Sequence, residues 1–273
     1  MVEKKPPAIK RPIITLTTDF GTKDHYVGAM KGVICEINPQ AKVIDITHDI
    51  PAHDLLGGAF TIRACYEYYP LNTIHVVVVD PGVGSKRRPI LVRTMNYYFI
   101  GPDNGVLSFI YDVEHISQVY ELTATHYFRQ PVSSTFHGRD IFASVAAYLS
   151  KVESSDDFGD PIEDYARINT PKPQVAGKGV KGHIMHVDRF GNLISNILLS
   201  DLKRFMEQTG SKRFQVSVAG KPVGPIAPNY SQGQGEVFAV TGSHGFLEVA
   251  ASQKSAATLL GCGRGQEIAV QLE

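Results

Sequence analysis

Short runs of β-branched and other apolar residues recur in the first half of the chain and predict strands. Four such runs cover residues 13–18, 43–47, 74–79 and 90–94. Residues 76–79 are all valine, which indicates a strand covered on both faces, as in the middle of a sheet with helices on each side. The first half of the chain is therefore predicted to be α/β.

Apolar residues at helical spacing lie between these runs and predict helices over residues 26–37, 55–68 and 140–149. Asp24 and Asp54 stand shortly before the first two stretches. Aspartate at such a position is a candidate N-cap.

The pattern changes at residues 170–182, which contain two prolines and three glycines without apolar periodicity. Beyond this stretch, helical spacing occurs at residues 201–208 and 255–260, and the other apolar runs are short and alternating. These runs predict strands over residues 183–187, 213–218, 237–240, 246–250 and 267–272. We therefore expect an α/β domain with a mostly parallel sheet at residues 1–175 and a smaller, mostly antiparallel β domain at residues 182–273.

Composition narrows the class of protein. The 273 residues are 43% hydrophobic and 20% charged, and 27 basic residues balance 27 acidic ones. Without net charge, neither nucleic acid nor an anionic membrane surface is an expected partner. No apolar stretch approaches the roughly 18 residues of a membrane span. Cys35, Cys65 and Cys262 form no CxxC pair, which argues against a zinc cluster or a disulfide framework. We therefore expect a reduced, cytoplasmic setting.

The first candidate site follows the first predicted strand, in the sequence TTDFGTKD at residues 17–24. Ligands bind at the carboxyl ends of strands in α/β sheets, and a carboxylate there can accept hydrogen bonds from a ribose diol. Asp19 is the candidate for this role. The alternative, a turn or capping carboxylate, suits Asp24 better.

The second candidate site is DPGVGSKRRP at residues 80–89, directly after the valine run. Asp80 directly follows a strand that is predicted to be buried. Arg87 and Arg88 come seven and eight residues later, close enough for the loop to fold back and pair one of them with Asp80. A plain turn remains the alternative reading for the Pro-Gly sequence. Burying an ion pair costs desolvation, so a functional reason for it is favoured.

Three further motifs carry polar groups. His137 lies in TFHGRD immediately before a predicted helix, where imidazole could move protons near neutral pH, although a capping or packed histidine is the alternative. In the second half, residues 187–192 and 241–246 are polar turns beside strands, and ordinary Asx-type turns look the same.

Residues 47–50 and 100–105 are polar loops that could line the same cleft. His48, Asp49 and His53 are close in sequence but lack a recognisable ligand spacing, so no metal is expected. Nothing singles out a second carboxylate for paired acid catalysis of the glycosidase kind.

Taken together, these stretches resemble one family, the S-adenosyl-L-methionine hydroxide adenosyltransferases, which are relatives of the fluorinase and chlorinase. The resemblance runs from about Pro12 to the C-terminus. It rests on six motifs in order: TLTTDFGTKDHYVGAMKG, VVVVDPGVGSKRRP, GPDNGVL, FHGRDIFA, VDRFGNLISNI and GSHGFLEVA.

The resemblance implies a Rossmann-like N-terminal domain with a seven-stranded sheet, a β-barrel-like C-terminal domain, and a homotrimer that binds its substrate between subunits. The implied reaction joins water to S-adenosyl-L-methionine and releases adenosine and L-methionine, with no cofactor. The family's catalytic triad falls by motif match on Asp80, Arg87 and His137. Arg88 is the alternative to Arg87.

The resemblance also implies substrate contacts. Asp19 resembles the ribose-diol carboxylate, Asp188 the group that holds the ammonium, Asn192 a group near adenine, and Ser243 one near the methionine carboxylate. The remaining implied contacts are Asp24, Tyr26, Gly138 and His244.

The halogenating relatives have tyrosine in place of Asp80 and arginine in place of His244, which argues against a halide-using enzyme. A non-catalytic protein that binds adenosine or S-adenosyl-L-methionine is the other alternative.

Overall fold

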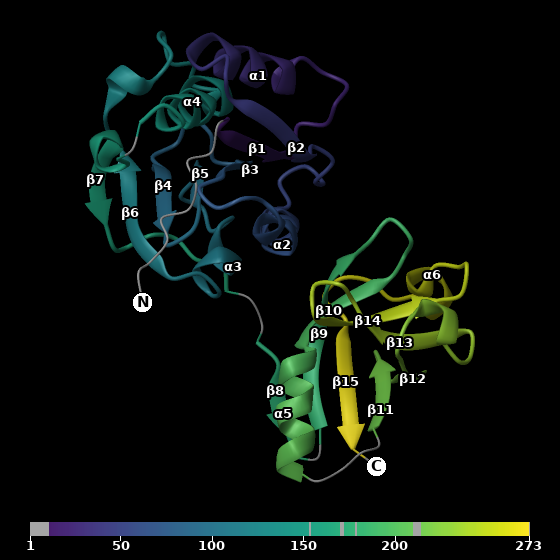
Figure 1. Cartoon of the computed structure of the whole chain (residues 1–273). Helices are drawn as coiled ribbons and strands as arrows, with labels where there is room; N and C mark the ends of the chain where they lie inside the picture. Colours follow the sequence, from purple (N-terminus) through teal and green to yellow (C-terminus); the bar gives the residue numbers. More distant parts are fainter. Residues whose placement is uncertain (1–10, 153, 170–171, 178, 210–213, 273) are drawn as a thin grey trace. The chain divides into compact units, whose positions relative to one another are not determined.

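The computed structural model describes residues 11–152, 154–169, 172–177, 179–209 and 214–272 (Figure 1). The chain divides into two compact units, Met1–Ile168 and Asn169–Glu273. The division falls just before the Pro- and Gly-rich stretch where the domain boundary was predicted. Within that stretch, strand β8 (Gln174–Ala176) pairs antiparallel with β9 (Gly179–Val187).

Within the described residues, the first unit contains a seven-stranded sheet in the order β2-β1-β3-β5-β4-β6-β7. Strands β2, β1, β3 and β5 are parallel neighbours, whereas β4, β6 and β7 are attached antiparallel. The strands are β1 (Ile13–Thr18), β2 (Lys42–Thr47), β3 (Ile74–Val78), β4 (Pro89–Thr94), β5 (Tyr98–Pro102), β6 (Ile116–Leu122) and β7 (Gly159–Ile162). The predicted α/β class is confirmed.

Helices cover both faces of this sheet. Helices α1 (Tyr26–Ile37) and α4 (Ser144–Leu149) lie on one face, and α2 (Leu55–Cys65) and α3 (Ser108–Tyr111) lie on the other (Figure 1). Val76 and Val78 belong to the core on the α1 side, and Val77 and Val79 belong to the core on the α2 side. The all-valine run therefore serves two cores, as its pattern predicted.

The helix starts match the sequence only in part. Asp54 caps α2 by accepting a hydrogen bond from the Gly57 N–H at 3.0 Å. Asp24 does not cap α1, because the N-cap position is His25, whose side chain makes no capping bond. The helix predicted over residues 140–149 begins as a π-helical segment, Gly138–Ala143, and continues as α4.

The second unit is a barrel. Its strand order is β10-β14-β13-β12-β11-β15-β9-β8, and β10 also pairs with β9, which closes the sheet. All pairings are antiparallel except that of β12 with β13. Its other elements are β10 (Leu193–Leu198), α5 (Leu199–Thr209), β11 (Phe214–Val218), β12 (Lys221–Ala227), β13 (Val237–Thr241), β14 (Phe246–Ala251), α6 (Ala256–Leu260) and β15 (Glu267–Leu272).

The predicted antiparallel β domain is thus confirmed, although residue 213, at the start of one predicted strand, lies outside the described residues. Alternate residues of the barrel strands enclose a core that includes Ile184, Leu193, Val216, Leu247 and Ile268. Among helices within the described ranges, none combines the length and hydrophobicity that crossing a membrane requires.

Candidate active site

Three side chains from separate parts of the first unit meet at one point. Asp80 follows β3, Arg87 precedes β4, and His137 precedes the π-helical segment. The Arg87 Nε lies 3.0 Å from each carboxylate oxygen of Asp80, and its Nη2 also bonds Asp80 Oδ2. The same Nη2 lies 2.8 Å from His137 Nδ1. His137 is 50 or more positions from Asp80 and Arg87 in the sequence, yet the three side chains form a single contact group.

The geometry fixes the proton on His137. A guanidinium has only N–H donors, so Nδ1 of His137 must accept, and the ring proton of the neutral imidazole is on Nε2. Burial lowers the pKa of His137, and the adjacent Arg87 charge lowers it further. His137 is therefore held neutral by its surroundings.

Arg87 retains an unused donor. Its side chain is 8% exposed and stands 5.3 Å from the centre of the Phe142 ring. Among the described residues, its Nη1 is buried and has no hydrogen-bond partner. A buried N–H pair is costly to leave unsatisfied, so this donor is suited to a polar group of a ligand.

The two neighbouring arginines are separated by their contacts. Arg88 does not reach Asp80 but bonds Asp103 at 2.7 and 3.0 Å and Asp164 at 2.8 Å. Of the two arginines that the sequence left open, Arg87 is the one in the group with Asp80 and His137.

Asp19 lies on the turn after β1. Its Oδ2 accepts a hydrogen bond from the His53 N–H at 2.8 Å. The turn itself is held by His48, whose Nδ1 lies 2.8 Å from Thr18 Oγ1 and whose carbonyl accepts from the Gly21 N–H at 2.7 Å. His48 Nε2 lies 3.0 Å from Asp45 Oδ1. His48 thus stabilises the turn that carries Asp19.

An aromatic group joins the Asp19 turn to His137. Tyr26 packs against Phe20 and Phe136, with ring centres 5.8 and 5.2 Å apart. A side chain at Gly138 would begin 3.3 Å from the Phe20 ring, so glycine allows this close packing. Tyr26 therefore packs against the residue before His137, and Gly138 follows His137 in the chain. Asp24 is exposed on the turn before α1. The sequence reading missed Phe20 and Phe136, which apolar spacing alone does not distinguish from core.

In the second unit, Asp188 and Asn192 contact each other. Asp188 Oδ1 accepts from the backbone N–H groups of Phe190 and Asn192 at 2.9 and 2.8 Å, and its Oδ2 accepts from Asn192 Nδ2 at 2.9 Å. This is an Asx-type turn, and it holds both predicted side chains at the end of β9.

Ser243 is exposed, and His244 lies beside a buried carboxylate that the sequence reading missed. His244 Nδ1 is 3.7 Å from Glu248 Oε1, and the Tyr230 hydroxyl donates to Glu248 Oε2 at 2.9 Å. Glu248 is 3% exposed, and burial raises its pKa. The available signal was a single charged residue in an otherwise apolar strand, FLEVAA.

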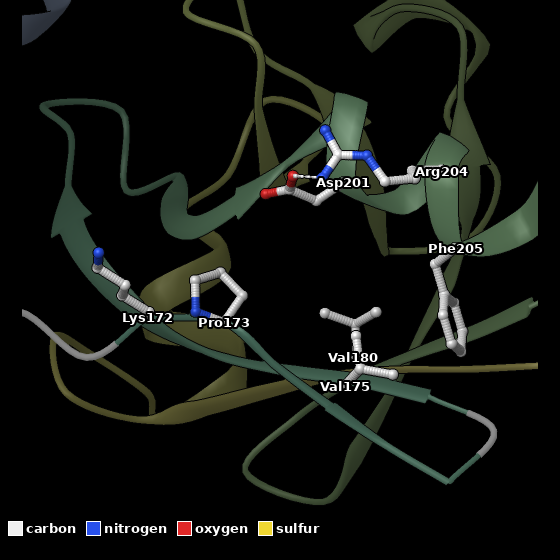
Figure 2. Close-up of a pocket in the computed structure, with 7 residues that line it drawn as sticks. All are labelled: Lys172, Pro173, Val175, Val180, Asp201, Arg204 and Phe205. Atoms are coloured by element: carbon white, nitrogen blue, oxygen red, sulfur yellow. Dashed lines mark ion pairs between the residues drawn. The ribbon is translucent and has the colours of Figure 1, made fainter. Parts of the chain in front are cut away.

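A hollow of about 330 Å³ in the second unit lies between α5 and the β8–β9 pair (Figure 2). Asp201 and Arg204, 3.9 Å apart, stand at one side of it, and Val175, Val180 and Phe205 line it. It contains none of the residues predicted to bind or transform a ligand. In the part of the chain that the structure describes, no cluster of three or more His, Cys, Asp or Glu side chains could hold a metal ion.

The protein has an α/β unit and a β-barrel unit, and the α/β unit contains the contact group of Asp80, Arg87 and His137. Family models match both units. Residues 14–159 match the SAM hydroxide adenosyltransferase N-terminal domain, and residues 182–269 match the C-terminal domain of the same family. The chain belongs to the SAM hydroxide adenosyltransferase family.

Individual relatives extend this result. The chain is 34% identical over 265 residues to an (R)-S-adenosyl-L-methionine hydrolase of Methanocaldococcus jannaschii, covering 94% of this chain and 95% of the relative. It is 27% identical to a fluorinase of an Actinoplanes species, over 72% of this chain and 76% of that enzyme. An uncharacterized conserved protein from Thermotoga maritima has a similar structure, with a TM-score of 0.87, 33% identity, and coverage of 94% of this chain and 99% of that one.

Proposed function

We propose that the protein is an S-adenosyl-L-methionine hydrolase that forms adenosine and L-methionine. The observation that carries this proposal is the contact group of Asp80, Arg87 and His137, with a buried Arg87 Nη1 that has no partner among the described residues. Greater identity to a hydrolase than to a fluorinase supports the same reaction.

The substrate needs little help to lose its leaving group. The sulfonium sulfur is positively charged, and methionine departs as a neutral thioether. The water oxygen attacks C5′, the C5′–S bond breaks, and its electron pair goes to sulfur. The reaction is thus a nucleophilic substitution in which the protein must position water and favour hydroxide.

The three side chains divide this task. Arg87 supplies positive charge and a free Nη1 donor to the oxygen that attacks. His137 accepts from Arg87 at Nδ1, so in its neutral form it can only donate from Nε2, which orients the water. Asp80 is then the group of the three that takes the water proton and later returns it to solvent.

We assign the substrate contacts by the family resemblance and the geometry. Asp19 uses its remaining carboxylate lone pairs for the ribose diol, beside Asp24, Tyr26 and Gly138. In the second unit, Asp188 attracts the ammonium group, Asn192 approaches adenine, and Ser243 with His244 holds the methionine carboxylate. We further propose a homotrimer in which these two sets of residues meet between subunits, and a reaction that uses neither metal nor cofactor.

We also propose that the enzyme acts on the (R) epimer at sulfur and works in the cytoplasm. The epimer is the one in the name of the M. jannaschii relative. The location is supported by three free cysteines, Cys35, Cys65 and Cys262, because thiols stay reduced in that compartment.

A product analysis in heavy-oxygen water tests the reaction. Wild-type protein with S-adenosyl-L-methionine should release methionine and adenosine that carries the heavy oxygen at C5′, with the (R) epimer consumed first. Formation of 5′-halo-adenosine in chloride or fluoride buffer would instead identify a halide-using enzyme. Intact ligand recovered after binding would identify a non-catalytic binding protein.

A further inference from the structure

Residues 101–105, at the end of β5 and the start of the connection to α3, form hydrogen bonds with both ends of the loop that carries Asp80 and Arg87. The latter loop spans residues 79–88 and joins β3 to β4, and β5 lies between those two strands in the sheet (Figure 1). From the sequence alone, GPDNG is part of a polar loop expected near the cleft and of a family motif, without a role for its side chains. Its contacts in the structure give it a more specific role.

Asn104 contacts the N-terminal end of the loop that carries Asp80 and Arg87. Its Nδ2 donates to the carbonyl of Val79, the residue before Asp80, at 2.9 Å. Its Oδ1 accepts from the Val106 N–H at 3.1 Å, which fixes the amide in this orientation. Rotation of the Val79–Asp80 peptide would break the bond to Asn104.

Asp103 contacts the C-terminal end of this loop, at the residue after Arg87. Its side chain is 5% exposed, and its Oδ2 accepts from Nε and Nη2 of Arg88 at 3.0 and 2.7 Å. Its backbone N–H donates to the Arg88 carbonyl at 2.8 Å, and Pro102 pairs with Pro89 at the start of β4. Arg88 is therefore fixed on both its side chain and its backbone, immediately after Arg87.

We propose that Asn104 and Asp103 are positioning residues that set the distance between the Asp80 carboxylate and the Arg87 guanidinium. The inference rests on the proposed function, because its effect is the alignment of the group that acts on water. Neither residue touches Asp80 or Arg87 by a side-chain hydrogen bond among the described residues, so each acts through the neighbouring residue. Misplacement of a reacting group by about 1 Å can cost a hundredfold in rate.

The principal test compares two asparagines in similar surroundings. Asn38 also accepts from the backbone N–H two residues later, at 3.1 Å, and also donates from Nδ2, to Ser150 Oγ at 2.8 Å. Serine at either position can keep the turn contact but is too short for the distant bond. We expect Asn104→Ser to lower kcat about 10- to 100-fold with KM within about twofold, while Asn38→Ser lowers the melting temperature similarly and leaves kcat unchanged.

A second pair of variants changes two carboxylates that both bond Arg88. Asp103→Asn removes the buried charge that binds Arg88, and it should lower kcat with little change in KM. Asp164→Asn removes a carboxylate that is 82% exposed and bonds the other side of Arg88, and it should leave kcat unchanged. This pair decides the matter if Asn104→Ser does not fold.

The outcomes separate the inference from the proposed function. Adenosine formation by the wild type with kcat retained in Asn104→Ser and Asp103→Asn would overturn the inference alone. Equal losses of kcat in Asn38→Ser and Asn104→Ser would also overturn it, because the effect would follow stability. A wild-type protein that forms no adenosine would overturn the proposed function together with the inference.

Discussion

At the scale of single residues, the contacts of Arg87 require a planar fork. The guanidinium bonds both oxygens of Asp80 and also Nδ1 of His137, whereas a lysine ammonium is a single point charge. We expect Arg87→Lys to lower kcat by about 100-fold with KM nearly unchanged. Arg93→Lys, which alters an arginine paired with Asp156 at 3.0 Å, is the control and should keep wild-type kcat in the same assay.

The proton on His137 sets the acid limit of the reaction. Burial and the charge of Arg87 lower the pKa of His137 below the usual 6.5. The neutral imidazole therefore persists as the pH falls to 6.5 and becomes protonated only at lower pH. We expect kcat to stay level from pH 8 to about 6.5 and to fall at lower pH. His137→Asn can still accept from Arg87 without titrating and should lack this fall. A wild-type kcat already halved above pH 6.5 would contradict the assignment.

Sequence reading singled out Asp80, Arg87 and His137 from polar motifs beside predicted strands and a predicted helix, and the structure places these three side chains in contact. It left Arg87 and Arg88 open, since neighbouring residues in a loop differ only in where their side chains point. Glu248 was missed for a related reason: one carboxylate in an apolar run gains meaning only from partners such as Tyr230, 18 residues away.

At the scale of elements, β3 contains a buried group that makes folding sensitive to acid. His75 is fully buried, lies 2.7 Å from Thr15 Oγ1, and stacks on Phe99. Burial lowers its pKa from 6.5 to about 3. Between these values the unfolded chain binds a proton that the folded chain excludes, so stability present above pH 6.5 is lost as the pH falls, by about 1.4 kcal/mol per pH unit.

Urea unfolding at several pH values between 4 and 7 measures this effect. His75→Asn does not titrate, and its unfolding free energy should depend less steeply on pH than that of the wild type. His126→Asn changes an exposed histidine and should retain the wild-type slope. Identical slopes for wild type and His75→Asn would show that His75 titrates equally in both states.

Strands with strong apolar runs were predictable, and those defined by partners were not. β1 and α1 match their predicted bounds, because periodicity and burial agree there. Residues 100–105, which include Gly101 and Pro102, are predicted to be a loop, yet residues 100–102 belong to β5 (Tyr98–Pro102), which pairs with both β3 and β4. β8 was hidden in a Pro- and Gly-rich stretch, and only its pairing with β9 makes it a strand. Such elements depend on tertiary contacts that local propensity does not contain.

At the scale of the whole molecule, the proposed site needs residues from both units, Asp80 from the α/β unit and Asp188 from the barrel. In a homotrimer with sites between subunits, each site takes the two sets from different chains, whereas a self-contained chain supplies both itself. Co-expression of Asp80→Asn with Asp188→Asn, each with its own tag, distinguishes these arrangements. In trimers purified through both tags, a cyclic arrangement leaves about one site in three with both units intact.

We therefore expect these mixed trimers to recover about one third of wild-type activity, although each variant alone is inactive. Asp80→Asn co-expressed with Arg87→Lys is the matched control, because both changes lie in the α/β unit and no site can then be intact. The rate of adenosine formation at a fixed substrate concentration measures the activity, and light scattering measures the mass of the assembly. Trimers that stay inactive in the first mixture would place each site within one chain, since only sites shared between chains can combine an intact Asp80 with an intact Asp188.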